Sequence, residues 1–220
     1  MMPNDQLNAS RRHFLAISAS TTLLGLMPEF SYASVIRTMQ GQVWVNSVLA
    51  TLNTLIKPGD IVKTGANSQV IFVIGDDVYK LGARSILRLR YNPGFSIVNA
   101  MRLISGSLLG VFGKRHGNRV IETQTATIGI RGTGLFLETN PNNTYFCTCY
   151  GDTEIISHDS NRQIKPVNAA YHKAYSISRH DAHNTAIASD IMKAHTDDEL
   201  YYLESLVGRQ PSAGFKSKSN

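Results

Sequence analysis

The sequence contains few of the residues that define several specialised protein classes. Only two of its 220 residues are cysteine and one is tryptophan. Two cysteines cannot form a disulfide-dense scaffold, and the low aromatic content does not indicate a haem protein or an aromatic cage. The longest apolar run is short and interrupted by Ser, Thr and Gly, whereas a membrane-spanning helix needs roughly 20 apolar residues. A polytopic membrane protein is therefore excluded.

Motifs of common enzyme classes are also absent. The chain has no Gly-x-Ser-x-Gly elbow, no phosphate-binding loop, no dinucleotide fingerprint and no His-Glu-x-x-His motif. We therefore predict that the protein is not an enzyme. An active site assembled from residues far apart in the sequence stays open as an alternative.

The overall composition is that of a folded, basic protein. Hydrophobic residues make up 42% of the chain, which is enough for a packed core, and the formal net charge is +6. The length suits one domain, or one domain with an extension. A positive balance favours anionic partners but does not indicate a fold.

Residues 1–33 have the three parts of an export signal. The stretch SRRHFL at 10–15 is basic, a mildly apolar run extends to Leu26, and Ser31-Tyr32-Ala33 is a small-x-small cleavage pattern. Paired arginines before Phe-Leu resemble a bacterial twin-arginine signal. We predict cleavage near Ala33, a mature chain without a transmembrane segment, and a periplasmic or secreted location; a short amphipathic helix is the alternative.

Residues 38–157 have the pattern of short β-strands separated by turns. The apolar run 70–74 ends at Gly75-Asp76-Asp77 and is followed at once by 78–81, which predicts a hairpin. In 86–90 leucines alternate with arginines, as in a half-buried strand. The spacing predicts a mainly β fold, a sandwich- or solenoid-like stack of short strands.

The sequence pattern of residues 158–220 differs from the strand pattern of 38–157 and predicts a C-terminal extension. Residues 165–178 are suited to one or two further strands, and 180–193 to a polar link. A capping box, Thr196 with Glu199, precedes an apolar stripe that predicts a short helix at about 197–207. The tail 216–220 is expected to be mobile. Asp197 and Asp198 are candidate acidic ligands, but charge at a helix N-terminus explains them more simply.

Five sequence blocks occur in an order typical of one family. They are GQVWVN (41–46), PGDIVKTGANS (58–68), YKLGARS (79–85), SGSL (105–108) and IETQTATIGIRGT (121–133). TYFCTCYG (144–151) and the pair Glu154-Ile155 complete the series. Together, residues 41–157 resemble a FecR domain.

The resemblance implies an all-β domain that acts outside the cytoplasm. Regulators of this family relay the state of an outer-membrane receptor to a sigma factor, using a transmembrane helix and a cytoplasmic anti-sigma segment. Neither feature is recognisable in this sequence. We therefore expect an exported, non-enzymatic binding or sensing protein that engages an envelope polymer or a periplasmic or outer-membrane protein.

Residues 78–121 contain no acidic residue but many basic ones. The basic residues are Lys80, Arg84, Arg88, Arg90, Arg102, Lys114, Arg115 and Arg119. Because alternate strand residues share a face, Arg88 and Arg90 lie on the same side. The block predicts a surface for an anionic polymer or an acidic protein, and nucleic acid is not expected; an ordinary solvated face is the alternative.

The Arg131-Gly132-Thr133 motif is interpreted as structural. Glycine permits a sharp turn or a positive φ, Arg131 packs or pairs locally, and Thr133 begins a strand.

Cys147 and Cys149 flank Thr148 on an expected strand, so both sulfurs lie on one face. A disulfide across a single strand residue is strained. With the downstream histidines His172, His180, His183 and His195 they form a candidate zinc or copper site, in which His180 and His183 share a face if helical. Free, half-buried thiols and no cofactor are the alternative.

Overall fold

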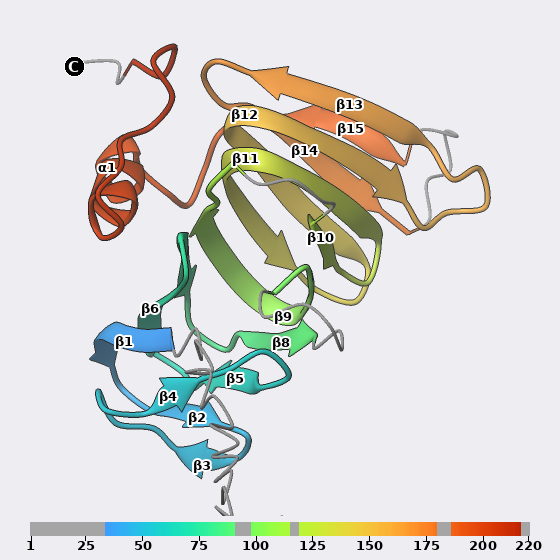
Figure 1. Ribbon diagram of the computed structural model, residues 1–220. Coiled ribbons are helices and arrows are strands. Elements are labelled where there is room, and N and C mark those ends of the chain that lie inside the picture. The colour runs from blue at the N-terminus through green and yellow to red at the C-terminus, as the bar shows by residue number, and fades with distance from the viewer. Residues whose placement is uncertain (1–33, 91–97, 115–118, 180–185, 217–220) are drawn as a thin grey trace, which may run out of the picture.

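The computed structural model describes residues 34–90, 98–114, 119–179 and 186–216. These residues form fifteen β-strands and one helix (Figure 1). The mainly β fold with a short C-terminal helix is confirmed. The signal peptide predicted at 1–33 and residues 217–220 of the predicted tail lie outside the described residues. Within the described part, no helix is long and apolar enough to span a membrane.

The first half of the chain forms eight short strands. They are β1 (Ser34–Gln40), β2 (Val43–Val45), β3 (Val48–Leu49), β4 (Leu55–Ile56), β5 (Ile61–Thr64), β6 (Gln69–Ile74), β7 (Asp77–Leu81) and β8 (Ile86–Arg90). The predicted hairpin is β6–β7, and β8 alternates between buried leucines and exposed arginines, as its sequence pattern indicates.

The second half contains longer strands and the helix. They are β9 (Ala100–Val111), β10 (Arg119–Glu122), β11 (Ala126–Thr139), β12 (Asn143–Ser157), β13 (Ile164–Ala169), β14 (Lys173–Ser178), β15 (Ile187–Asp190) and α1 (Asp197–Ser205). The helix ends close to its predicted limit, at C-cap Leu206, and Gly208 follows with φ +68°.

All fifteen strands belong to one mixed sheet. The main order is β15-β14-β12-β11-β10-β9-β7-β6-β1-β4, and every pairing is antiparallel except β9–β10. A branch β3-β2-β5-β8 joins β9 at its N-terminal half, while β7 joins its C-terminal half. The long strands therefore bend, and the sheet folds back on itself without closing into a barrel.

Glycines in left-handed conformations mark the bends of the long strands. Gly106, Gly132 and Gly151 have φ of +78°, +67° and +88° in β9, β11 and β12. The register between β11 and β12 shifts between Arg131 and Gly134, beside two of them. Such bulges let one strand pair with different neighbours along its length.

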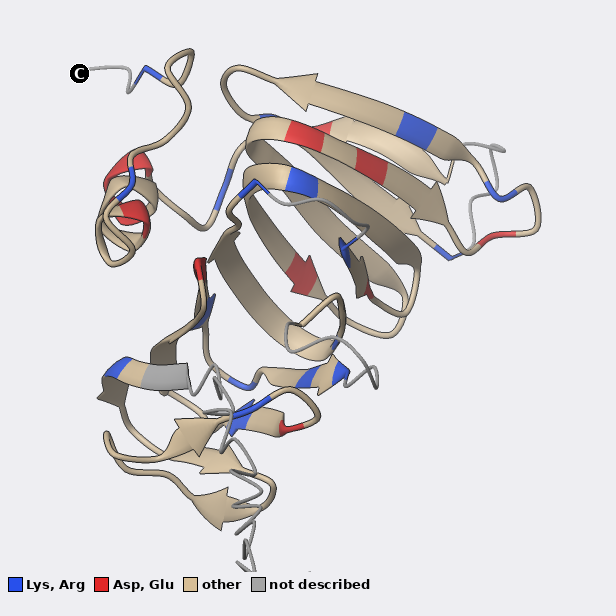
Figure 2. Ribbon diagram, in the orientation of Figure 1, with Lys and Arg blue, Asp and Glu red and all other residues tan. Residues whose placement is uncertain are grey.

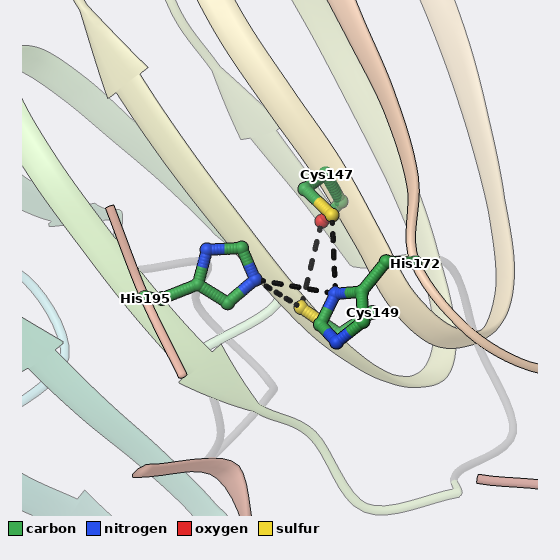
Figure 3. Close-up of side chains that lie close together, drawn as sticks. All are labelled: Cys147, Cys149, His172 and His195. Atoms are coloured by element: carbon green, nitrogen blue, oxygen red, sulfur yellow. Dashed lines mark hydrogen bonds between the residues drawn. The ribbon is translucent and has the colours of Figure 1, made fainter. Parts of the chain in front are cut away.

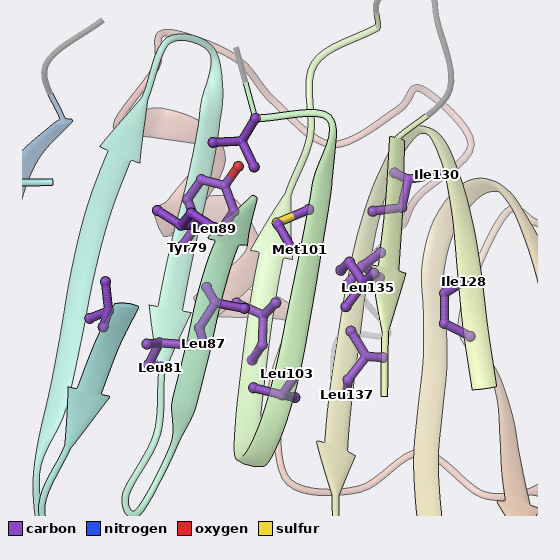
Figure 4. Close-up of a cluster of buried hydrophobic side chains, with 14 of the residues drawn as sticks. Tyr79, Leu81, Leu87, Leu89, Met101, Leu103, Ile128, Ile130, Leu135 and Leu137 are labelled. Carbon is purple, nitrogen blue, oxygen red and sulfur yellow. The ribbon is translucent and has the colours of Figure 1, made fainter. Parts of the chain in front are cut away.

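The main core lies between the folded layers of the sheet. Apolar side chains from β7, β8, β9 and β11 meet there, including Tyr79, Leu87, Met101, Leu103 and Leu135, each fully buried (Figure 4). This burial supplies the dominant stabilising term of the fold.

A second apolar cluster lies beneath α1. Leu200 and Leu203 of the helix are fully buried against a group that includes Val78, Leu109 and Val111. Cys147 and Cys149 belong to this cluster, so α1 covers the sheet face on which both sulfurs lie.

The C-terminal third is more regular than its sequence indicated. The predicted polar link at 180–193 contains β15, which pairs with β14. In turn, β14 pairs with the N-terminal half of β12, and β13 pairs with its C-terminal half. The strands of the predicted extension therefore continue the sheet formed by residues 34–157.

Candidate metal centre and basic face

Four side chains from three parts of the chain converge beside α1. Cys147 and Cys149 lie on β12, His172 directly precedes β14, and His195 lies between β15 and α1. One ligand atom from each lies within 4.8 Å of the others (Figure 3). We refer to these four residues as the Cys/His cluster.

The distances within the Cys/His cluster are those of a coordination shell. Cys147 Sγ lies 3.5 Å from His172 Nδ1, Cys149 Sγ lies 3.3 Å from His195 Nε2, and the two nitrogens are 3.3 Å apart. Tetrahedral zinc has Zn–S bonds of about 2.3 Å and Zn–N bonds of about 2.0–2.1 Å. Those bonds place sulfur and nitrogen about 3.6 Å apart and two nitrogens about 3.4 Å apart. The three contacts thus have lengths close to the edges of such a tetrahedron, and all four donor atoms lie within 4.8 Å of one another.

The outer nitrogens of both imidazoles are held by hydrogen-bond acceptors. His172 Nε2 lies 2.8 Å from Asp197 Oδ1, and His195 Nδ1 lies 2.9 Å from the carbonyl oxygen of Lys193. Both contacts require the imidazole to donate, so in each neutral ring the lone pair is on the nitrogen that faces the cluster. Metal-binding histidines are oriented in this way by carboxylates and carbonyls.

Asp197 is itself fixed by a second contact. Tyr171 donates its hydroxyl to Asp197 Oδ2 at 3.0 Å, so both carboxylate oxygens are used. Asp197 is also the first residue of α1. The sequence offered Asp197 as a candidate acidic ligand and favoured a charge role at the helix N-terminus, whereas the structure adds the orientation of His172.

The protonation of the two thiols is unequal in this environment. The pKa of Cys147 lies well below its usual range, mainly because of a hydrogen bond with Cys149. Burial opposes this shift, and contacts with His172 and His195 add to it. Burial and the neighbouring Cys147 raise the pKa of Cys149. Burial lowers the pKa of His172, but its hydrogen bonds with Cys147 and Asp197 raise that pKa by a larger amount, so the net shift is upward. The direction of these shifts favours a thiolate at Cys147, the form of cysteine that binds metal.

Aromatic rings surround the cluster and exclude water from it. Phe136 stacks on His195 at 4.8 Å between ring centroids, and Phe215 meets the His172 ring edge at 5.5 Å. Both cysteines are fully buried, and His195 is 7% exposed.

Cys147, His172 and Asp197 also have the order of a nucleophile, a base and an orienting acid. Cys147 has no exposed surface. The presence of two more donors at the same point favours a metal ion instead.

Two of the predicted histidine ligands are not tested by the structure. His180 and His183 lie outside the described residues, whereas His172 and His195 both join the cysteines. The spacing of these residues gave no means of choosing among the four histidines, because His172 and His195 approach the cysteines through strand pairing and the docking of α1.

The predicted basic face is only partly present. Arg88 and Arg102 are cross-strand neighbours on β8 and β9, and exposed Arg90 is paired with Glu122 at 2.9 Å. Figure 2 shows Lys and Arg on β8 and also on other strands, such as β11 and β13. Arg84 is exposed in the turn before β8, and exposed Lys114 follows the opposite end of β9. Arg115 lies outside the described residues, and Lys80 forms an ion pair with Glu199 of α1.

The inclusion of Arg119 in that face was wrong. Its side chain is 4% exposed, and its Nη1 lies 2.6 Å from Asp77 Oδ1. Its guanidinium also donates to the carbonyl oxygen of Gly113. A buried arginine with two partners stabilises the fold and is not available to an external anion.

The Arg131-Gly132-Thr133 segment contains the conformation that the sequence indicated. Gly132 has a positive φ, and Arg131 is exposed opposite Asp152 on β12. Thr133 is fully buried, but it lies inside β11 and does not begin a strand.

No protein-family model matches the chain, and no curated protein matches its sequence. The fold is similar to two crystal structures of a "putative anti-sigma factor" from Parabacteroides distasonis, at 1.65 and 2.50 Å resolution. The TM-scores are 0.50 and 0.51, the sequence identities 11% and 10%, and the matches cover 61% and 64% of this chain. They cover 60% and 63% of the other chains. This chain therefore spans less than two thirds of those proteins, and at this identity the likeness concerns the fold alone.

Proposed function

We propose that this protein is a non-enzymatic regulatory binding module that holds one zinc ion in its Cys/His cluster. The observation that carries the proposal is the convergence of four donor atoms at tetrahedral spacing, with both imidazole lone pairs directed toward the same point. Without an ion, these electron-rich atoms face one another in an apolar surrounding, which is costly.

The donor set favours zinc over copper. Two thiolates and two imidazoles in a closed tetrahedron are a common structural zinc site. Copper(I) shares the preference for thiolates, whereas the blue-copper type of centre is trigonal, with one cysteine and two histidines. With four buried protein ligands the site has no open position for a substrate, so zinc here links parts of the fold and does not activate water.

The regulatory part of the proposal is supported by the fold. The similar Parabacteroides structures are described as an anti-sigma factor, a class that acts through protein partners. The order of FecR-like blocks at 41–157 and the twin-arginine pattern at 11–12 support a FecR-type sensing role outside the cytoplasm. We propose a periplasmic or secreted protein whose partner is an envelope protein or an anionic envelope polymer.

Elemental analysis of the purified protein tests the metal centre directly. We expect about one zinc per chain, and we expect Co²⁺ in its place to give the intense visible absorption of tetrahedral cobalt–thiolate coordination. Cys149→Ser should remove this absorption, whereas His158→Ala, at an exposed histidine bonded to Thr127, should retain it. Protein that lacks metal, takes up no zinc and gives no cobalt spectrum would falsify the proposal.

A further inference from the structure

A second feature, far from the Cys/His cluster in the sequence, is an exposed apolar projection. Residues 46–56 contain no charged side chain. Within them Val48, Leu49, Leu52 and Leu55 are 70%, 59%, 55% and 50% exposed. These four, which we call the apolar tip, are a majority of the most exposed large hydrophobic side chains in the described part of the chain.

The apolar tip is held in a defined shape. Asn46 and Ser47 have φ of +50° and +69°, as in the tight two-residue turns that join hairpin strands, here β2 and β3. The Asn46 side chain donates to Asp60 Oδ1 at 2.7 Å and accepts from the backbone N–H of Ile61 at 2.9 Å. In a second turn the Thr54 hydroxyl accepts from the N–H of Thr51 at 2.9 Å.

Core packing does not account for this exposure. Ala50 and Ile56, in the same stretch, are buried and are the residues that pack into the core. The four exposed side chains instead project from the hairpin and the turn beyond it. Clustered exposed apolar side chains on a folded protein usually mark a contact surface.

Cationic side chains lie beside the apolar tip. Trp44 pairs with Leu49 on one side and with Lys63 on the other, and Lys63 Nζ lies 5.6 Å from the Trp44 ring centroid. In the next row Ile61 pairs with Arg88. Exposed Lys57 directly follows the uncharged stretch.

The nearest acid in the sequence is Asp60, which sets one negative charge against the three cations Lys57, Lys63 and Arg88. Asp60 accepts from Asn46 and from the N–H of Lys57, each at 2.7 Å. Beside the tip, a hollow of about 410 Å³ is lined by Trp44, Lys63, Ile61 and Ile86. It offers a lysine and an aromatic ring at the boundary between the apolar and the cationic side chains.

We propose that the apolar tip and the cations beside it form a docking surface for an anionic phospholipid bilayer. The aliphatic side chains enter the acyl region, Trp44 lies at the interface where tryptophan is preferred, and Lys63, Lys57 and Arg88 meet headgroup phosphates. Projecting aliphatic side chains with a cationic border match a bilayer surface better than a sugar polymer, which offers little apolar area.

Charge complementarity decides in favour of lipid over a second copy of the chain. A second copy meeting at this surface would present the same excess of positive charge, from its own Lys57, Lys63 and Arg88, and no complementary negative patch. An anionic bilayer supplies the opposite charge and the apolar interior together. The proposal does not depend on the metal centre.

Vesicle binding of the full chain tests the proposal, with Trp44 as the reporter because it is the only tryptophan in the sequence. Vesicles of phosphatidylcholine mixed with phosphatidylglycerol should shift its fluorescence to the blue, and acyl-brominated lipids should quench it. Vesicles of phosphatidylcholine alone should bind more weakly, by about fivefold for each phosphate-contacting cation. High salt should weaken the binding in the same way.

Paired variants separate the tip from other exposed apolar residues. Leu49→Ser combined with Leu52→Ser should weaken vesicle binding by about tenfold or more per leucine. The matched control is Ile164→Ser on β13, because Ile164 is 60% exposed but lies outside the tip. Lys63→Gln should reduce the preference for phosphatidylglycerol. Residues 1–33 are identical in every variant, so differences among variants report the tip.

Three results would overturn the proposal. They are the absence of any Trp44 shift or quenching with anionic vesicles, binding that the double leucine variant leaves unchanged, and a concentration-dependent dimer that the same variant abolishes. The last result would assign the tip to self-association. Each of them leaves the zinc content, and thus the proposed function, unaffected.

Discussion

At the scale of single residues, the orientation of His172 depends on one carboxylate. Asp197 accepts from His172 Nε2 and from Tyr171, and so fixes both the ring and its tautomer. We predict that Asp197→Ala lowers zinc affinity by about 10- to 100-fold, as loss of such outer contacts usually does. Competition with a chromophoric chelator measures the effect.

Asp198→Ala is the matched control, because Asp198 is exposed in the same first turn of α1. Both variants remove one negative charge from the helix N-terminus. Equal losses of affinity in the two variants would mean that charge near α1 matters and the orientation of His172 does not.

The buried pair of Arg119 and Asp77 gives a second residue-scale prediction. Arg119→Met leaves Asp77 buried without its guanidinium, and breaking a buried pair costs about 3–5 kcal/mol. Arg90→Met breaks the partly exposed pair with Glu122 and should cost less than about 1 kcal/mol. Denaturant unfolding measures both, and similar costs for the two variants would contradict the prediction.

Sequence patterns predicted the cysteines and four candidate histidines at this scale, but not which of those histidines lie beside the sulfurs. The spacing of Cys147 and Cys149 places both sulfurs on one face because strand side chains alternate. His172 and His195 approach them only through the pairing of β12 with β14 and the docking of α1. Arg119 was misassigned because its partner, Asp77, directly precedes the acid-free block and is 42 residues away.

At the scale of elements, the bend of β12 depends on a glycine that no other residue replaces cheaply. Gly151 has φ +88°, and an added Cβ would lie 2.7 Å from the Gly132 carbonyl oxygen. Gly151→Ala should therefore cost more than the ~1 kcal/mol of left-handed strain alone. Gly208→Ala, with φ +68° and nothing within 4 Å, should cost only that strain. Equal unfolding free energies for the two variants would show that the close contact relaxes.

The contact of α1 with the sheet predicts a response to acid. Burial opposes ionisation of Glu199, but bonds from Lys80 and Thr196 lower its pKa below 4.5 in the folded protein. A lowered pKa means stability that is present above pH 4.5 and is lost as pH falls through the folded value. Protection of the α1 amides, measured against their intrinsic exchange rate at each pH, should fall on acidification, and Glu199→Gln should remove part of that pH dependence. A variant with the unchanged pH profile would exclude this pair as the cause.

Local signals predicted the elements whose boundaries depend on short-range contacts. The capping box of Thr196 and Glu199 and the β6–β7 turn are complete within a few residues of sequence. β15 was missed because only one of its four residues is buried, so its sequence has no strand alternation. It is a strand because β14 offers an edge for pairing.

At the scale of the whole molecule, the mainly β class could be predicted while the sheet order could not. Frequent turns and alternating apolar residues suffice for the class. The order places β9 beside β7, β8, β10 and β11, and it depends on bends at glycines such as Gly106 and on contacts between distant segments. The likeness to the Parabacteroides structures likewise lies in the fold and is weak in the sequence.

The Cys/His cluster joins the C-terminal segment, residues 191–216, to the sheet. His195 comes from that segment, Phe215 packs on His172, and Asp197 holds the same histidine. The segment is also attached by the burial of Leu200 and Leu203, by the Lys80–Glu199 ion pair, and by hydrogen bonds from Tyr145 and Tyr150 of β12. The proposed zinc ion would therefore connect this helical segment to β12 and to the residue preceding β14.

Removal of the metal should accordingly loosen one region before the whole fold. A ligand present at 1,000 times its dissociation constant stabilises the native state by about 4 kcal/mol, so a chelator should lower the melting temperature. Hydrogen exchange in residues 191–216 should rise first, because local opening is enough to release His195. The β6–β7 hairpin, anchored in the main core by Phe72 and Tyr79, should keep its protection. Equal increases in both regions would mean that the ion stabilises the fold as a whole and does not specifically hold the C-terminal segment.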